Sequence, residues 1–192
     1  MTTTDLIQIA TIITQSNIEI IKVSVKKMSD TQLNWKPAET SWSVNEVLSH
    51  LNEYGRYYNP VFLRKIENTR FTSTKEAFLS SPLGRSAWKS MKLGNVKNIR
   101  RKIKSAKDSN PTVTPSLLEG EQVNTFANQQ NELLSIINKS TAVNIRRVKI
   151  PISRSKVVRL RLGDALLFVV YHNERHMQQI LNLQNSPNFP VH

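Results

Sequence analysis

The sequence has no cysteine among its 192 residues. This absence excludes a disulfide framework and a thiolate metal site. Any metal ion must therefore be held by nitrogen and oxygen atoms. With 39% hydrophobic residues, the chain has enough apolar side chains for one substantial core, and we expect a single domain over residues 1–192.

Long hydrophobic runs are also missing. The longest apolar stretch covers residues 165–171, far fewer than the roughly 20 residues that a membrane-spanning helix needs. The N-terminus, Met-Thr-Thr-Thr-Asp, lacks the basic start, the apolar run and the small-residue cleavage site of a secretory signal. These absences predict a cytoplasmic protein that does not insert into a membrane.

Acidic residues are scarce compared with basic ones. There are 14 Asp and Glu against 27 Lys and Arg, which gives a net charge of +13 and a pI near 10.2. Such a charge favours nucleic acid or another anionic partner through counterion release. The basic side chains are dense in residues 85–107 and 146–161. However, the sequence has no recognition-helix motif, no zinc-finger spacing and few aromatic residues among the basic ones. A non-catalytic protein whose basic surface binds nucleic acid or another anionic partner is therefore the less favoured alternative.

Hydrophobic periodicity predicts four amphipathic helices. Apolar residues recur at intervals of three and four over residues 6–28, 43–69, 121–141 and 165–183. Ser43 and Glu46 match a capping box at the start of the second helix, and Pro60 predicts a kink within it. Asp164 is the expected N-cap of the fourth helix. The predicted fold is all-α, a four-helix bundle.

Two segments interrupt the helical pattern. Residues 71–120 carry several prolines and glycines and predict a long basic excursion with one short helix. Residues 145–161 alternate between apolar and basic side chains, which predicts a short hairpin or an extended crossover. The tail over residues 186–192 is expected to be irregular, and Trp35 and Trp42 are expected to cover one end of the bundle.

Three of the four histidines lie on the apolar faces of predicted helices. His172 and His176 are four residues apart, about 40° on a helical wheel, so both can reach one ion. His50 shares the inward stripe of the second helix with Val47 and Tyr54. Imidazole accepts zinc, nickel and ferrous iron, so the ligand type does not identify the metal. The alternative is that these histidines are hydrogen-bonded core residues.

The histidine pair has the spacing of a zinc-protease helix but lacks its glutamate. That motif needs glutamate directly after the first histidine, where this chain has Asn173, and Glu174 points to the opposite side of the helix. Three imidazoles leave a coordination position open to water or substrate, which is typical of a catalytic site. Water bound there would be acidified toward neutrality, and a thiol would become a thiolate nucleophile.

Three segments resemble the hallmark regions of the DinB/YfiT-like superfamily. They are LNWKP at residues 33–37, WSVNEVLSHL at residues 42–51 and YHNERHMQQI at residues 171–180. The resemblance spans most of the chain. It implies an up-and-down-type four-helix bundle, a divalent metal (zinc, nickel or iron) on His50, His172 and His176, and a homodimer. Members of this family include bacillithiol-dependent S-transferases, a mycothiol-dependent maleylpyruvate isomerase and proteins described as metal-dependent hydrolases.

The resemblance therefore implies a metal-dependent enzyme that acts on a small-molecule substrate. It leaves open a hydrolase, an S-transferase that uses a low-molecular-weight thiol, and a bundle that keeps the metal without turnover. Three further side chains are candidates for catalysis. Glu53 could orient a ligand imidazole or take a proton, and Arg175 and Gln179 could contact a polar or anionic substrate. Tyr54 and Tyr57 are expected to serve in packing.

Overall fold

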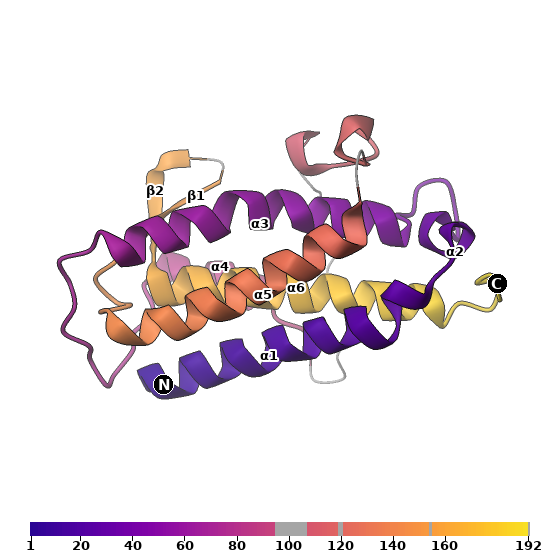
Figure 1. Ribbon diagram of the computed structural model, residues 1–192. Helices are drawn as coiled ribbons and strands as arrows, with labels where there is room; N and C mark the ends of the chain where they lie inside the picture. The colour runs from indigo at the N-terminus through magenta and orange to yellow at the C-terminus, as the bar shows by residue number, and fades with distance from the viewer. Residues whose placement is uncertain (95–106, 119–120, 154, 192) are drawn as a thin grey trace.

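Four long helices form the computed structural model, which describes residues 1–94, 107–118, 121–153 and 155–191. They are α1 (Thr3–Val23), α3 (Val44–Glu67), α5 (Gln122–Lys139) and α6 (Leu162–Gln184). α1 and α3 each pack against both α5 and α6, so the order around the bundle is α1, α5, α3, α6 (Figure 1). The predicted four-helix bundle is confirmed.

The four helices do not alternate in direction along the chain. The first halves of α1 and α6 share one hydrophobic cluster with the second halves of α3 and α5, and the remaining halves share another. α1 and α6 therefore run one way and α3 and α5 the other (Figure 1). This arrangement corrects the up-and-down order that the resemblance implied. Because α3 and α5 are parallel, the chain must return along the bundle between them, which explains the long excursion.

Capping boxes fix the starts of the early helices. Ser43 Oγ accepts a hydrogen bond from the Glu46 amide at 3.2 Å, and the Glu46 carboxylate accepts one from the Ser43 amide at 2.7 Å. This confirms the box predicted for α3. The short helix α2 (Asp30–Asn34) was not predicted, although Ser29 followed by Gln32 gives it a capping box of the same kind.

Asp164 does not cap α6, contrary to the prediction. The helix begins three residues earlier than predicted, at Leu162, and Arg161 takes the cap position. The buried Asp164 carboxylate instead accepts hydrogen bonds of 3.0 Å from both the amide and the hydroxyl of Ser81. Ser81 is the N-cap of α4 (Pro82–Met91), the short helix expected in the excursion. Asp164 therefore fixes the start of α4 against α6.

Residues 145–161 contain an antiparallel hairpin, one of the two structures that the alternating pattern predicted. Its strands are β1 (Lys149–Ile152) and β2 (Ser155–Arg161). Ile150 pairs with Leu160, and both side chains are buried in the core of the bundle. The hairpin therefore closes the end of the bundle at which α6 begins.

The opposite end of the bundle is covered by aromatic side chains, as expected. Trp35 and Trp42 are half-buried against the second hydrophobic cluster. The Trp35 ring meets the Phe189 ring edge-on, with centroids 5.5 Å apart. Gln32 Nε2 donates to the Pro190 carbonyl at 2.9 Å. These contacts hold the irregular tail on the end of the bundle.

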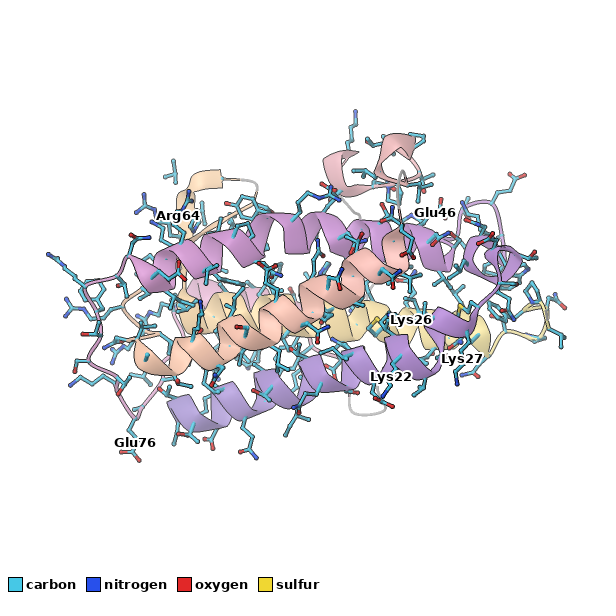
Figure 2. The ribbon with its side chains drawn as sticks, viewed as in Figure 1. Lys22, Lys26, Lys27, Glu46, Arg64 and Glu76 are labelled. Carbon is cyan, nitrogen blue, oxygen red and sulfur yellow. The ribbon has the colours of Figure 1, made fainter. Side chains whose placement is uncertain are left out.

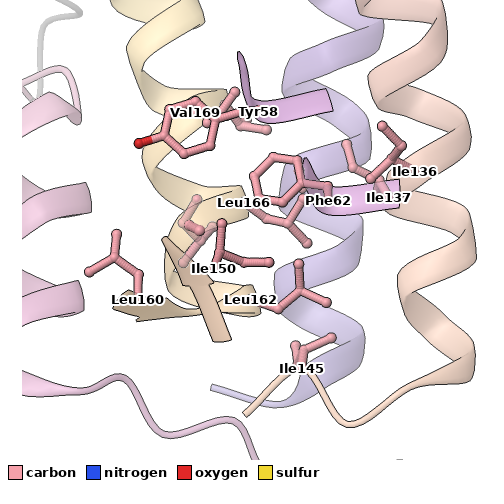
Figure 3. Close-up of a cluster of buried hydrophobic side chains, with 14 of the residues drawn as sticks. Tyr58, Phe62, Ile136, Ile137, Ile145, Ile150, Leu160, Leu162, Leu166 and Val169 are labelled. Carbon is pink, nitrogen blue, oxygen red and sulfur yellow. The ribbon is translucent and has the colours of Figure 1, made fainter. Parts of the chain in front are cut away.

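A layer of polar side chains divides the core into two parts. The first hydrophobic cluster contains Phe62 and Leu166 (Figure 3), and the second contains Leu48 and Ile180. Between them all four helices contribute buried polar residues: Thr14, Asn17, His50, Asn52, Gln130, His172 and Asn173. Burying so many polar groups is unfavourable unless they are bonded to one another or to a ligand. The layer is therefore the natural place to look for a functional site.

Basic side chains are prominent on the described surface. Lys22, Lys26 and Lys27 are exposed together near the end of α1 (Figure 2), and Arg146 and Arg147 are exposed near the hairpin. The densest basic run falls in residues 95–106, outside the described residues. Nucleic-acid binding thus stays the less favoured alternative, which the described residues do not test. Within the described ranges, no helix combines the length and the apolar character that crossing a membrane requires.

Candidate metal centre

The three histidines predicted as ligands come together in the polar layer. His50 projects from α3, and His172 and His176 project from α6, which packs against α3 in the opposite direction. One ring nitrogen from each lies within 4.8 Å of the others. The ring centroids are 4.7–5.1 Å apart. The helical spacing and the inward stripes therefore produce the expected convergence, and the role of these residues as ligands stays a prediction.

Two of the imidazoles are oriented by acceptors on their Nδ1 atoms. His50 Nδ1 lies 2.6 Å from the Ser109 carbonyl, and His176 Nδ1 lies 2.9 Å from Gln179 Oε1. A carbonyl oxygen can only accept, so each Nδ1 carries the proton and each Nε2 presents a lone pair. Such outer partners are the usual way in which proteins fix the tautomer of a metal-binding histidine.

His172 is the least satisfied member of the group. Its Nε2 lies 3.2 Å from His50 Nε2, and its Nδ1 is buried without a hydrogen-bond partner among the described residues. Because His50 Nε2 presents a lone pair, the contact is favourable only if His172 Nε2 carries a proton and donates it. A cation could replace this proton, and the Nε2 lone pairs of His50 and His172 would then both bind the cation. Three neutral nitrogens facing one another in a buried layer fit a divalent metal such as zinc, nickel or iron.

Burial lowers the pKa of all three histidines. Desolvation is the main cause for His50 and acts against a smaller opposite effect of the Ser109 carbonyl. The pKa of His176 falls to about 3, through desolvation and then through repulsion by His50. The pKa of His172 is well below its usual value, for the same reason together with its two neighbouring imidazoles. At neutral pH the rings are uncharged, the form in which imidazole binds metals.

Aromatic rings surround the imidazoles. Tyr54 packs on His172 with centroids 4.2 Å apart, and Phe168 lies parallel to the same ring at 6.0 Å. Trp42 covers His50 at 5.0 Å and stacks over His176 at 6.2 Å. Trp42, Tyr54 and Phe168 are only partly buried, so this aromatic wall extends from the site to the surface.

The three candidate catalytic residues lie in different places. Gln179 contacts the His176 ring and thus acts on a candidate ligand. Arg175 is buried, and its positive charge contributes to the lowered pKa values of His172 and His176. Glu53 pairs with Arg56 on the outer side of α3. Within the described part of the chain, the residues that could hold a metal are histidines without a carboxylate.

Two site residues escaped sequence reasoning. Ser109 contributes a main-chain carbonyl, which leaves no trace in side-chain patterns. The sequence predicted only that Trp42 covers one end of the bundle, and it gave no indication of the ring contacts with His50 and His176. A signal did exist, because the Ser43 capping box begins α3 directly after Trp42 and places His50 two turns later, facing α6.

Comparison with known proteins identifies the family and supports the fold. Residues 19–180 match the sequence profile of the DinB superfamily. The chain belongs to this superfamily. It is 24% identical over 171 residues, 84% of this chain and 89% of the other, to the uncharacterized protein YuaE of Bacillus subtilis (strain 168). Its fold is similar to that of YfiT from Bacillus subtilis, with a TM-score of 0.52, 15% identity, and coverage of 95% of this chain and 85% of YfiT. YfiT is described as a probable metal-dependent hydrolase with an unusual four-helix bundle topology.

The contact between Gln179 and His176 can be tested by substitution. Gln179→Ala removes the acceptor on Nδ1 and is expected to weaken Zn²⁺ binding by about 10-fold or more, since outer partners of ligand histidines have effects of this size. Gln179→Glu keeps an acceptor and is expected to restore the affinity. Gln178→Ala, whose parent side chain donates to Asn182, is the control on the exposed side. Equal affinities for the alanine variant and the parent, measured by chelator competition, would argue against an orienting role.

Proposed function

We propose that this DinB-superfamily protein is a metal-dependent enzyme whose metal is held by His50, His172 and His176. The observation that carries the proposal is the convergence of three imidazoles, two of them buried and His176 half-buried, with the tautomers of His50 and His176 favoured by acceptors on Nδ1. The likeness to YfiT, described as a probable metal-dependent hydrolase, supports it.

A divalent cation with an open coordination position acts as a Lewis acid and lowers the pKa of a bound water or thiol. The chain supplies the conditions for this chemistry. Ser109 and Gln179 hold two imidazoles in the required tautomer. The rings of Trp42, Tyr54 and Phe168 exclude water from one side of the centre, which strengthens electrostatic interactions there.

The charges around the site favour an anionic reactant. Three neutral ligands leave the charge of a divalent ion uncompensated, and Arg175 adds a further positive charge close by. An anionic group in the open position is therefore stabilised. A thiolate meets this requirement and is a strong nucleophile at neutral pH. Thiol transfer to a small electrophile is thus one form of the proposal, and hydrolysis, which uses a deprotonated water, is the other.

The proposal is tested by measuring metal content and activity together. Untagged protein is expected to contain close to one metal ion per chain, and His50→Ala little. Arg56→Ala, on the exposed side of α3, is the matched control and should keep the metal. The loaded parent is then assayed with a panel of esters and amides, and with low-molecular-weight thiols plus an alkylating electrophile.

The two forms of the proposal give different results in these assays. Thiol-dependent product formation that disappears in His50→Ala would assign an S-transferase, and thiol-independent cleavage a hydrolase. Metal binding without turnover in either assay would indicate a binding protein. A parent that takes up no metal even after reconstitution would contradict the proposal, and the histidines would then be core residues.

A further inference from the structure

Residues 107–118 form a strap that lies over α3 on the outside of the bundle (Figure 1). The strap contains two short 3-10 helices, Lys107–Ser109 and Pro115–Leu118, joined by a turn. Within it, Thr114 donates from its amide to the Asn110 carbonyl at 2.8 Å and from its hydroxyl to the Lys107 carbonyl at 2.8 Å. The strap is therefore a locally ordered unit.

Three polar anchors join the strap to the histidine-bearing part of the chain. The Ser109 carbonyl accepts from His50 Nδ1 at 2.6 Å. The Leu117 carbonyl accepts from the Ser49 hydroxyl, also at 2.6 Å, and Trp42 Nε1 donates to the Thr112 hydroxyl at 3.1 Å. Two anchors come from adjacent residues of α3, and the third comes from the ring that covers His50 and His176.

Apolar burial contributes little to the attachment of the strap. Val113 is 54% exposed and Leu118 is 37% exposed, whereas Pro111 is buried. Hydrophobic contact is normally the main force that holds such a segment on a surface. Here the attachment depends largely on polar contacts. These are the three anchors, one of which involves the candidate metal ligand His50, and a 3.3 Å hydrogen bond from Gln122 Nε2 of α5 to the Leu117 carbonyl.

We infer that Ser109 is a positioning residue for the metal centre, and that docking of the strap and binding of the metal reinforce each other. When His50 Nε2 binds a cation, the ring proton must reside on Nδ1, the tautomer that donates to Ser109. Without the cation the Ser109 carbonyl still favours the proton on Nδ1, as in this structure, but the preference is weaker and a fraction of the molecules can carry the proton on Nε2. The Nδ1 lone pair would then face the Ser109 carbonyl oxygen, and the strap would lose this anchor.

The coupling is reciprocal by thermodynamic necessity. If the metal stabilises the docked strap, the docked strap raises the affinity for the metal by the same factor. Removing an anchor that does not touch the metal should therefore weaken metal binding. This inference rests on the proposed function, since it requires that the histidines bind a metal.

Hydrogen exchange with Zn²⁺ tests the inference in the full-length chain. Amides of residues 109–117 are expected to exchange more slowly after Zn²⁺ is added to chelator-treated protein, while residues 68–76, at the far end of α3, stay unchanged. Ser49→Ala and Thr112→Val remove one anchor each, from opposite sides of the contact. Each should raise the Kd for Zn²⁺ by at least about fivefold. Thr141→Val, which loses a hydroxyl bonded to Asn138 instead, should leave the Kd unchanged.

The outcomes separate this inference from the proposed function. Zn²⁺ binding with unchanged exchange in the strap and unchanged Kd in both anchor variants would overturn the inference alone. A parent that binds no Zn²⁺ would overturn the proposed function and the inference with it. Slower exchange in the parent, lost together with affinity in the two anchor variants, would establish the coupling.

Discussion

The His172→Leu variant is expected to lose its bound metal and yet to be more stable than the metal-free parent. His172 is 4% exposed, its Nδ1 has no partner within the described residues, and its ring packs against Tyr54 and Phe168. A buried polar atom without a partner costs about 1–3 kcal/mol, and leucine has a similar volume without that cost. Leucine also removes the 3.2 Å contact with His50 Nε2, which offsets part of this gain, so we expect the free energy of unfolding to rise by about 1 kcal/mol.

Urea denaturation at pH 7 in the presence of a chelator measures this effect. Gln178→Leu, on the same helix but toward the surface, should change stability by less than about 0.5 kcal/mol. A lower urea midpoint for His172→Leu than for the parent would mean that the imidazole is well bonded in the metal-free state. With saturating Zn²⁺ the order should reverse, because only the parent gains stability from binding.

The metal-free protein is expected to lose stability steadily as the pH falls below about 6.5. Unfolded histidines take up protons near that pH, whereas burial keeps the pKa of His172 well below it and that of His176 at about 3. The unfolded state therefore binds more protons in this range, and each buried histidine contributes a slope of up to about 1.4 kcal/mol per pH unit. Above pH 6.5 the contribution is fully present and constant.

Denaturation midpoints between pH 7 and about 5.3 test this dependence, since most carboxylates, with ordinary pKa values of about 3.9–4.3, are still largely ionised there. The double variant His172→Leu/His176→Leu should show a much flatter profile than the parent. Parallel profiles for the two proteins would refute the assignment of the acid sensitivity to these histidines. In Zn²⁺ the parent should start from higher stability and fall more steeply, because protons compete with the metal for the same nitrogens.

The histidine cluster could be predicted from the sequence because its determinants are local. The spacing of His172 and His176 puts both on one face, and the apolar stripe around His50 turns that residue inward. The contact with Ser109 could not be predicted. It involves a main-chain carbonyl in a segment without hydrophobic periodicity, and only the folded chain brings it to His50.

The directions of the helices and the role of Asp164 could not be predicted from the sequence either, because both depend on tertiary contacts. An amphipathic stripe shows which face is buried but does not show which neighbour covers it or how that neighbour runs. The parallel arrangement of α3 and α5 therefore had only an indirect signal, the length of the connection between them. Asp164 follows a glycine before an apolar helix, as a cap would, yet its carboxylate bonds Ser81 on another element. Tertiary contacts decided between two roles that are equally compatible with the local sequence.

The distance along the chain between His50 and His172 has a consequence for biosynthesis. The two residues are separated by 122 positions, and the second helix that bears histidines is made after the other three. During translation the apolar faces of α1, α3 and α5 remain without their α6 partner, and the cluster that can hold the ion does not yet exist. If the three histidines bind a metal as proposed, its uptake must follow synthesis of α6, so the nascent chain cannot use the ion to guide its early folding. Chelation during expression should leave a folded bundle that can be loaded afterwards.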